Sequence, residues 1–246
     1  MSEGRQRARE LREEMSRTEA GFLAQEARVD RLQLSYEAAC AKFAEAAKLD
    51  PDNVAIWGEL GDLWIVRGSL DEAGRAFSSA RDAAARSHDD RDLSVAFNKI
   101  GDVRQAQGDL DGALASYQAS HAIFERLAKA DPGNAGWQRD LSVSHDNIGD
   151  LQQAQGDLAA ALASYQTSLV IAERLAKADP GNARWQRDLA ISYSRVARIE
   201  MKQGRRDDAL KALRQGREII LQILQRLPDN PRLRSDLTWF ESQIGS

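Results

Sequence analysis

The sequence predicts an all-α fold, an α-solenoid built from antiparallel helix pairs. Residues 92–139 and 140–187 are one 48-residue unit written twice, with 35 of the 48 positions identical. A repeat of this length with helical patterning indicates a stack of like units, each burying its apolar face against its neighbours. The composition agrees, because the chain has only 5 prolines in 246 residues and few β-branched runs that would favour strands.

Each unit has the pattern of a helical hairpin, with two apolar stripes separated by a glycine turn. One set of glycines is expected to end the first helix in the left-handed conformation: Gly68, Gly108, Gly156 and Gly204. A second set is expected to let the two helices of a pair approach closely: Gly61, Gly101 and Gly149.

These spacings resemble the tetratricopeptide repeat. Over residues 54–87 the signature positions of that family hold Trp57, Leu60, Gly61, Trp64, Gly68, Ala73, Phe77 and Ala80. Residues 36–53 match its second helix through Ala39, Phe43, Ala46 and Pro51. The family repeat has about 34 residues. In the later units of this chain, from about residue 110 on, each helix is longer by seven residues, or about two turns, which keeps the apolar stripe on one face. Such long repeats are similar to those of kinesin light chains and of some bacterial signalling and defence proteins.

Along the chain we expect a charged helix or tail at residues 1–19, about five repeats, and a C-terminal capping helix at 231–246. The repeats lie near residues 20–53, 54–91, 92–139, 140–187 and 188–230. The first turn is expected to be weak, because Leu34 stands where a glycine belongs. A helix break is expected near residues 87–91, where Ser-His-Asp-Asp replaces the usual proline stop. In the cap, Leu233, Leu237, Phe240 and Ile244 share one helix face.

Two features have more than one interpretation. The N-terminal region could form a longer continuous helix that dimerises, because it has no glycine or proline between residues 22 and 50 and has apolar residues spaced by seven. These residues are Met15, Phe22, Val29, Tyr36 and Phe43. A monomer with a solvated or frayed N-terminus is the main expectation. The paired Trp137 and Trp185 could form a cage for a cationic ligand, or could pack the added helical turns against each other.

Composition argues against several classes of function. With 34 basic and 38 acidic residues, the net charge of −4 gives no general attraction to nucleic acid or anionic membranes. No segment approaches the ~20 apolar residues of a membrane-spanning helix, and the N-terminus has no signal-peptide core, so a cytoplasmic location is expected. Cys40 is the single cysteine, which excludes an intrachain disulfide. His88, His121 and His145 are too far apart for a metal site, and no catalytic motif is present. We expect no cofactor, no metal and no enzymatic activity.

In tetratricopeptide repeats the first helix of each hairpin lines the concave surface. That resemblance implies a partner-binding face made of Asp62, Asn98, Asp102, Gln105, Asp146, Asp150, Gln153, Arg198 and Lys202. The row of Asp62, Asp102 and Asp150 is acidic and becomes basic at Arg198 and Lys202. One interpretation is that a protein segment bearing Lys or Arg lies along the row while Asn and Gln bind its backbone. The other is that the aspartates only solvate the face and favour the turn.

The predicted function is therefore that of a non-enzymatic scaffold or adaptor that binds a protein or peptide. The acidic row argues against the family members that clamp an acidic peptide C-terminus. The alternative is a regulatory sensor in a bacterial signalling or defence system, whose solenoid changes shape when a ligand binds.

Overall fold

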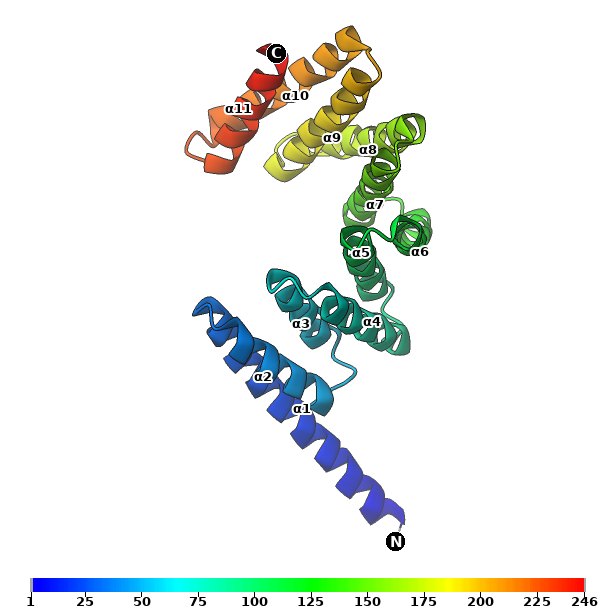
Figure 1. Ribbon diagram of the computed structural model, residues 1–246, viewed down its shortest axis with the longest axis vertical. Helices are drawn as coiled ribbons and strands as arrows, with labels where there is room; N and C mark the ends of the chain where they lie inside the picture. The colour runs from blue at the N-terminus through cyan, green and yellow to red at the C-terminus, as the bar shows by residue number, and fades with distance from the viewer. Residues whose placement is uncertain (1, 246) are drawn as a thin grey trace. The chain divides into compact units, whose positions relative to one another are not determined.

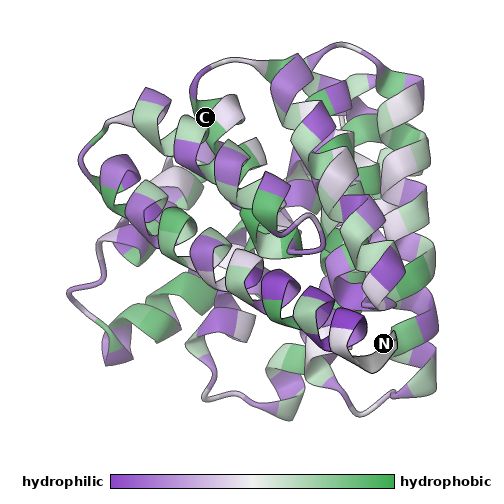
Figure 2. Ribbon diagram, turned by 90° about the horizontal axis from the view of Figure 1, so that it is seen from below, coloured by the Kyte–Doolittle hydropathy of each residue, from purple (hydrophilic) through white to green (hydrophobic). Residues whose placement is uncertain are grey.

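The computed structural model describes residues 2–245 and confirms the all-α fold (Figure 1). Those residues form eleven helices and no strand. The helices are α1 (Ser2–Leu32), α2 (Tyr36–Leu49), α3 (Val54–Val66), α4 (Leu70–Ser87), α5 (Asp90–Ala106), α6 (Leu110–Ala130), α7 (Ala135–Ala154), α8 (Leu158–Ala178), α9 (Ala183–Lys202), α10 (Arg206–Arg226) and α11 (Pro231–Gly245). Hydrophobic and hydrophilic residues alternate along the helices, as amphipathic packing requires (Figure 2).

The contacts divide the chain into two compact units, Met1–Ile123 and Phe124–Ser246, and the division falls within α6. We call them unit 1 and unit 2 and describe each by itself. None of the helices over residues 2–245 is long and apolar enough to cross a membrane.

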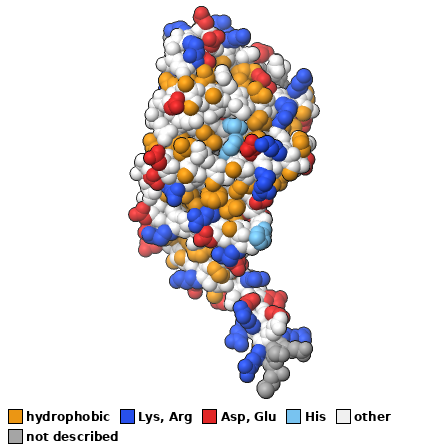
Figure 3. All heavy atoms as spheres, turned by 90° about the vertical axis from the view of Figure 1, so that its right-hand side faces the viewer, with side chains coloured by type: hydrophobic (Ala, Val, Ile, Leu, Met, Phe, Trp, Pro, Cys, Tyr) orange, Lys and Arg blue, Asp and Glu red, His pale blue; other side chains and the backbone are white. Residues whose placement is uncertain are grey.

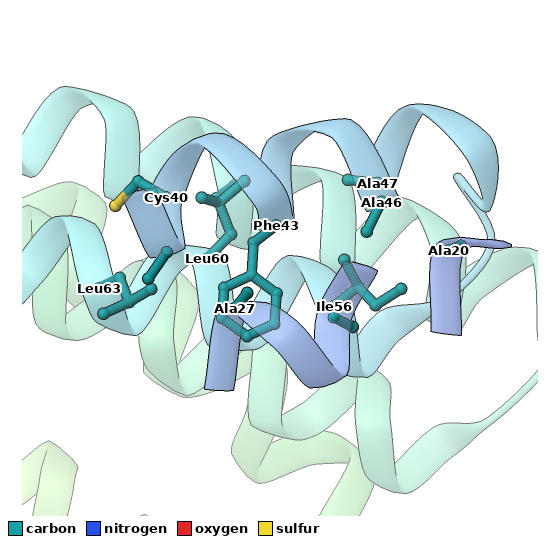
Figure 4. Packing of buried hydrophobic residues seen from close by; sticks show 12 residues of the cluster. Ala20, Ala27, Cys40, Phe43, Ala46, Ala47, Ile56, Leu60 and Leu63 are labelled. Atoms are coloured by element: carbon teal, nitrogen blue, oxygen red, sulfur yellow. The ribbon is translucent and has the colours of Figure 1, made fainter. Parts of the chain in front are cut away.

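In unit 1 each of the helices α1 to α4 packs against the next one in the chain. Phe43 of α2 lies at the centre of the core (Figure 4), between the alanines of α1 and the aliphatic side chains of α3. Ala20 and Ala27 of α1 are fully buried there. Small residues on α1 thus allow α2 to approach closely and bury a large aromatic ring.

In unit 2 the helices α7 to α11 also pack in chain order. Leu233 and Phe240 of α11 are buried against α9 and α10, with Leu237 and Ile244 partly buried beside them. Gly216 of α10 makes room for this contact, since a Cβ there would lie 2.5 Å from the ring of Phe240. The predicted apolar face of the last helix is therefore the face that packs.

The two sets of glycines have the predicted roles. Gly68, Gly108, Gly156 and Gly204 all have positive φ, between 74° and 85°. At the close approaches, a Cβ on Gly61 would lie 2.5 Å from the ring of Phe77, and one on Gly101 would lie 2.5 Å from the ring of Tyr117. A Cβ on Gly149 would lie 2.7 Å from the ring of Tyr165. The predicted helix break is also confirmed, because α4 ends at Ser87 and His88 has φ 54°.

The charged N-terminal segment is a solvated helix, as one sequence interpretation allowed, but it is not separate from the first repeat helix. Helix α1 is continuous from Ser2 to Leu32, so residues 2–19 extend the first repeat helix. The continuous helix through residues 22–50 was a wrong alternative, because the chain turns between α1 and α2 with Leu34 at φ 60°. Met15, Phe22 and Val29 therefore lie on α1, whereas Tyr36 and Phe43 lie on α2.

Candidate partner-binding face

The nine predicted residues all lie on the first helix of a hairpin. In unit 1, Asp62 is on α3 and Asn98, Asp102 and Gln105 are on α5. In unit 2, Asp146, Asp150 and Gln153 are on α7, and Arg198 and Lys202 are on α9. We call the side of these helices that carries the nine residues the first-helix face of each unit.

Two of the aspartates hold the second helix of their own hairpin. The hydroxyl of Tyr117 donates to Asp102 at 2.7 Å and lies 3.1 Å from Oε1 of Gln105. The hydroxyl of Tyr165 donates to Asp150 at 2.6 Å. Burial, followed by this hydrogen bond, raises the pKa of Tyr165. The aspartate that follows the close-approach glycine, Gly101 or Gly149, is therefore an anchor for the aromatic ring that packs on that glycine.

A basic residue on the next first helix neutralises two of the aspartates. Nζ of Lys99 lies 2.7 Å from Asp62 in unit 1. In unit 2, Arg195 pairs with Asp150, and Arg198 lies 3.2 Å from the same carboxylate. Lys99 and Arg195 were not among the residues predicted from the sequence. Their sequence positions could have indicated this role, because both stand at the same position of their repeats, 96 residues apart, and each follows an aspartate on the first helix of the preceding hairpin.

Asp146 is the most deeply buried carboxylate of the face, with 8% of its surface exposed. Its nearest basic partner is Nε of Arg195 at 3.6 Å, which is too long for a hydrogen bond. Burial raises the pKa of Asp146 to about 6, although the charge of Arg195 opposes this. The carboxyl group therefore titrates close to neutral pH.

Three of the predicted residues have a buried side-chain oxygen without a hydrogen-bond partner among residues 2–245. They are Asn98 through Oδ1, Asp146 through Oδ1 and Gln153 through Oε1. Asn98 and Asp146 stand at the same position of the two near-identical repeats. Buried acceptors are normally paired, so these three oxygens are acceptors that the fold itself does not use.

A groove of about 610 Å³ lies on the first-helix face of unit 2, between α7, α9 and the α10–α11 turn. Five arginines and two aspartates line it: Arg139, Arg184, Arg187, Arg195, Arg232, Asp146 and Asp188. Arg139 pairs with Asp188 at 2.6 Å, and Arg187 pairs with Asp236 at 2.6 Å. Among the described residues Arg184 and Arg232 have no ion-pair partner, so the mouth of this groove is basic.

A smaller groove of about 300 Å³ lies in unit 1, between α3, α4 and α5. Glu59, Asp62 and Asp92 line it against the single base Lys99, together with apolar groups such as Val95. Burial and the neighbouring Asp89 raise the pKa of Asp92. This groove is therefore acidic and apolar, in contrast to the basic groove of unit 2.

The tryptophans and histidines supply no further site. Trp185 lines the groove of unit 2 and Trp137 does not, and both begin a helix whose Asn cap accepts their backbone N–H. Over the described residues no group of three His, Cys, Asp or Glu side chains could hold a metal ion.

Comparison with known proteins agrees with this arrangement. The model of a family described as tetratricopeptide repeat matches residues 26–88. A search of curated proteins finds no match to this sequence. The fold is similar to a solved structure of BtubC (BKLC) from P. vanneervenii, with TM-score 0.67 and 14% identity over 87% of this chain and 91% of that chain.

Two other solved structures are similar at the same level. A putative kinesin light chain from Podosopora anserina has TM-score 0.63 and 16% identity, over 82% of this chain and 94% of that one. A structure of MamA has TM-score 0.56 and 16% identity, over 81% and 96%. At such identities the likeness concerns the fold. Residues 26–88 therefore match the tetratricopeptide repeat family, and the chain has the helical-hairpin fold of tetratricopeptide-like proteins.

Proposed function

We propose that this protein is a non-enzymatic scaffold that binds a segment of another protein along its first-helix faces. Tetratricopeptide-like proteins generally serve as protein-interaction scaffolds, which gives the class of function. The observation that supports the site is the set of unused buried acceptors on Asn98, Asp146 and Gln153. They coincide with three of the nine positions chosen from sequence alone.

An acceptor that is buried without a partner costs about 1–3 kcal/mol. A bound peptide in extended conformation offers one backbone N–H per residue, and such a donor would remove that cost once the side chain turns its oxygen, which is buried in the structure, toward the peptide. The side-chain oxygens would then recognise the backbone of the partner and be tolerant of its sequence. Asn98 and Asp146 stand at equivalent positions of two repeats, and both have an acceptor of this kind. This recurrence fits a binding mode in which each repeat contacts the partner through the same position.

Charge would add selectivity at the two grooves. Asp62 and Asp150 are already paired within the chain, so they contribute less to attraction than their number suggests. In unit 1, Glu59 is also paired, with Arg28 and Arg31, whereas Asp92 has no ion pair among the described residues and favours a Lys or Arg side chain of the partner. In unit 2, Arg184 and Arg232 at the mouth of the groove favour an acidic one.

Gln153→Met tests the role of the acceptors, because methionine has a similar size and no carbonyl oxygen. Gln105→Met is the matched control: it stands at the same position of the preceding repeat, but its oxygen already lies within hydrogen-bond distance of Tyr117. Peptides selected from a displayed random library on the wild-type chain would serve as probes, with affinities measured by fluorescence anisotropy. We expect Gln153→Met to weaken binding about tenfold.

Gln105→Met should leave the affinity of the same peptides nearly unchanged, and should lower the free energy of unfolding by about 1 kcal/mol. Equal affinities for wild type and Gln153→Met would contradict the proposed use of the acceptors. A library that yields no binding peptide at all would contradict the scaffold function itself.

A further inference from the structure

Helix α1 has a row of large apolar side chains on the side that faces away from α2. The exposed fractions are 54% for Leu11, 71% for Met15, 70% for Phe22 and 44% for Val29. The opposite side of the same helix carries the buried Ala20, Ala24 and Ala27. An apolar row of this length on a surface that is otherwise charged marks an interaction surface.

The first half of α1 also has little support from the other described helices, apart from a hollow that it lines with the end of α2. Helix α1 has 31 residues, whereas α2, its neighbour, has 14, and the N-terminal part of α1 extends beyond α2 (Figure 1). Residues 4–15 are exposed at every position, and Figure 3 shows basic and acidic side chains mixed along this end. A solitary helix of that length is only marginally stable in water, so a partner helix would stabilise it.

We propose that α1 pairs in antiparallel orientation with α1 of a second copy of this chain, centred near residue 20. In that register a residue of the apolar row in one copy faces a residue of the second copy, and the two residue numbers add up to 40. The layers are Leu11 with Val29, Met15 with Gln25, and Thr18 with Phe22, each occurring twice. Every layer then contains at least one apolar side chain, whereas a parallel pair would place Thr18 on Thr18 and Gln25 on Gln25.

The flanking charges select the same orientation. In the antiparallel pair Arg12 faces Glu26 of the second copy, and Glu14 faces Arg28. Arg28 is already held by Glu59 at 2.6 Å and Glu26 by Lys42 at 3.1 Å, so both contacts between the copies would be shared with an ion pair inside each chain. Glu19 facing its own counterpart opposes the pairing. A parallel pair would oppose Arg7 to Arg12 and Glu14 to Glu19, which are all like charges.

Light scattering after gel filtration tests the pairing. We expect the wild type at micromolar concentration to have twice the 27.2 kDa mass of the chain. Phe22→Glu should raise the dissociation constant of the dimer at least about tenfold, since it removes two buried phenyl rings. Val170→Glu is the control, because Val170 is equally exposed at 64% on α8. A monomeric wild type, or equal effects of both variants, would overturn the proposal.

Orientation has its own test. Arg12→Glu should weaken the antiparallel dimer, and adding Glu26→Arg should restore it, whereas Arg12→Glu would strengthen a parallel one. Oxidation of single-cysteine variants gives a second readout: Gly21→Cys should form a disulfide between copies, and Leu11→Cys should not, because position 11 lies opposite position 29. The native Cys40 is buried and serves as background. Self-coupling of Leu11→Cys would rule out the antiparallel arrangement.

Discussion

At the scale of single residues, Asp146 makes the stability of unit 2 depend on pH. Burial raises the pKa of Asp146 from 3.8 to about 6, so the folded chain binds this proton more tightly than the unfolded chain. The contribution to stability is complete below about pH 4 and is lost as pH rises through 6. Arg195, Asp150 and Asp188 are the charged groups around it.

Asp146→Asn should remove this dependence while keeping the size of the side chain. The free energy of unfolding of the variant, relative to wild type, should rise between pH 4 and pH 7 by up to about 3 kcal/mol. Urea unfolding at a series of pH values measures this difference. A difference that is flat with pH would mean that Asp146 titrates at its ordinary value when folded.

The repeat period predicted that the nine residues lie on the first helices of their hairpins, and the structure has them there. The period could not predict how the aspartates are used. Asp102 and Asp150 each accept a hydrogen bond because the ring that packs on the neighbouring glycine is a tyrosine, Tyr117 or Tyr165. In the repeat of Asp62 that ring is Phe77, which has no hydroxyl group. The arginines that line the groove in unit 2 come from different helices. The repeat period does not predict that such residues lie close together in space.

At the scale of helices, the turn between α1 and α2 is strained by its sequence. Leu34 has φ 60° and is 70% exposed, so it bears the cost of a left-handed backbone without burying its side chain. Gly108, with φ 82°, fills the equivalent turn after α5. Leu34→Gly should therefore stabilise unit 1 by up to about 1 kcal/mol.

Thermal and urea unfolding of Leu34→Gly against wild type check this value. Gly108→Leu is the reciprocal variant and should destabilise the chain by a similar or larger amount. This turn was visible in the sequence as a missing glycine, whereas the length of α1 was not. Gly21 stands next to the boundary assigned near residue 20, but the helix runs through it, so that boundary followed the family repeat rather than a helix start in the local residues.

At the scale of the whole molecule, the cores of a repeat protein are local, because each repeat contacts only the repeats next to it along the chain. The contacts of this chain fall into two compact units that divide within α6. Cooperative unfolding of all 246 residues in one step is therefore not expected. The repeat period in the sequence predicted the local hairpins. The division into two units could not be predicted, because it depends on contacts between all the helices and is not marked by any feature along the sequence.

Two matched glycine variants test this division. Gly61→Ala in unit 1 would place a Cβ 2.5 Å from Phe77, and Gly149→Ala in unit 2 would place one 2.7 Å from Tyr165, each costing about 1–3 kcal/mol of stability. Fluorescence of Trp64 reports on unit 1 and that of Trp185 on unit 2, when the other tryptophans are replaced by phenylalanine. We expect each variant to lower the urea midpoint of its own reporter and to leave the other nearly unchanged, because neighbouring helices carry the contacts in each unit. If both reporters shifted together in both variants, the repeats would unfold as a single cooperative array, and the division within α6 would have no energetic counterpart.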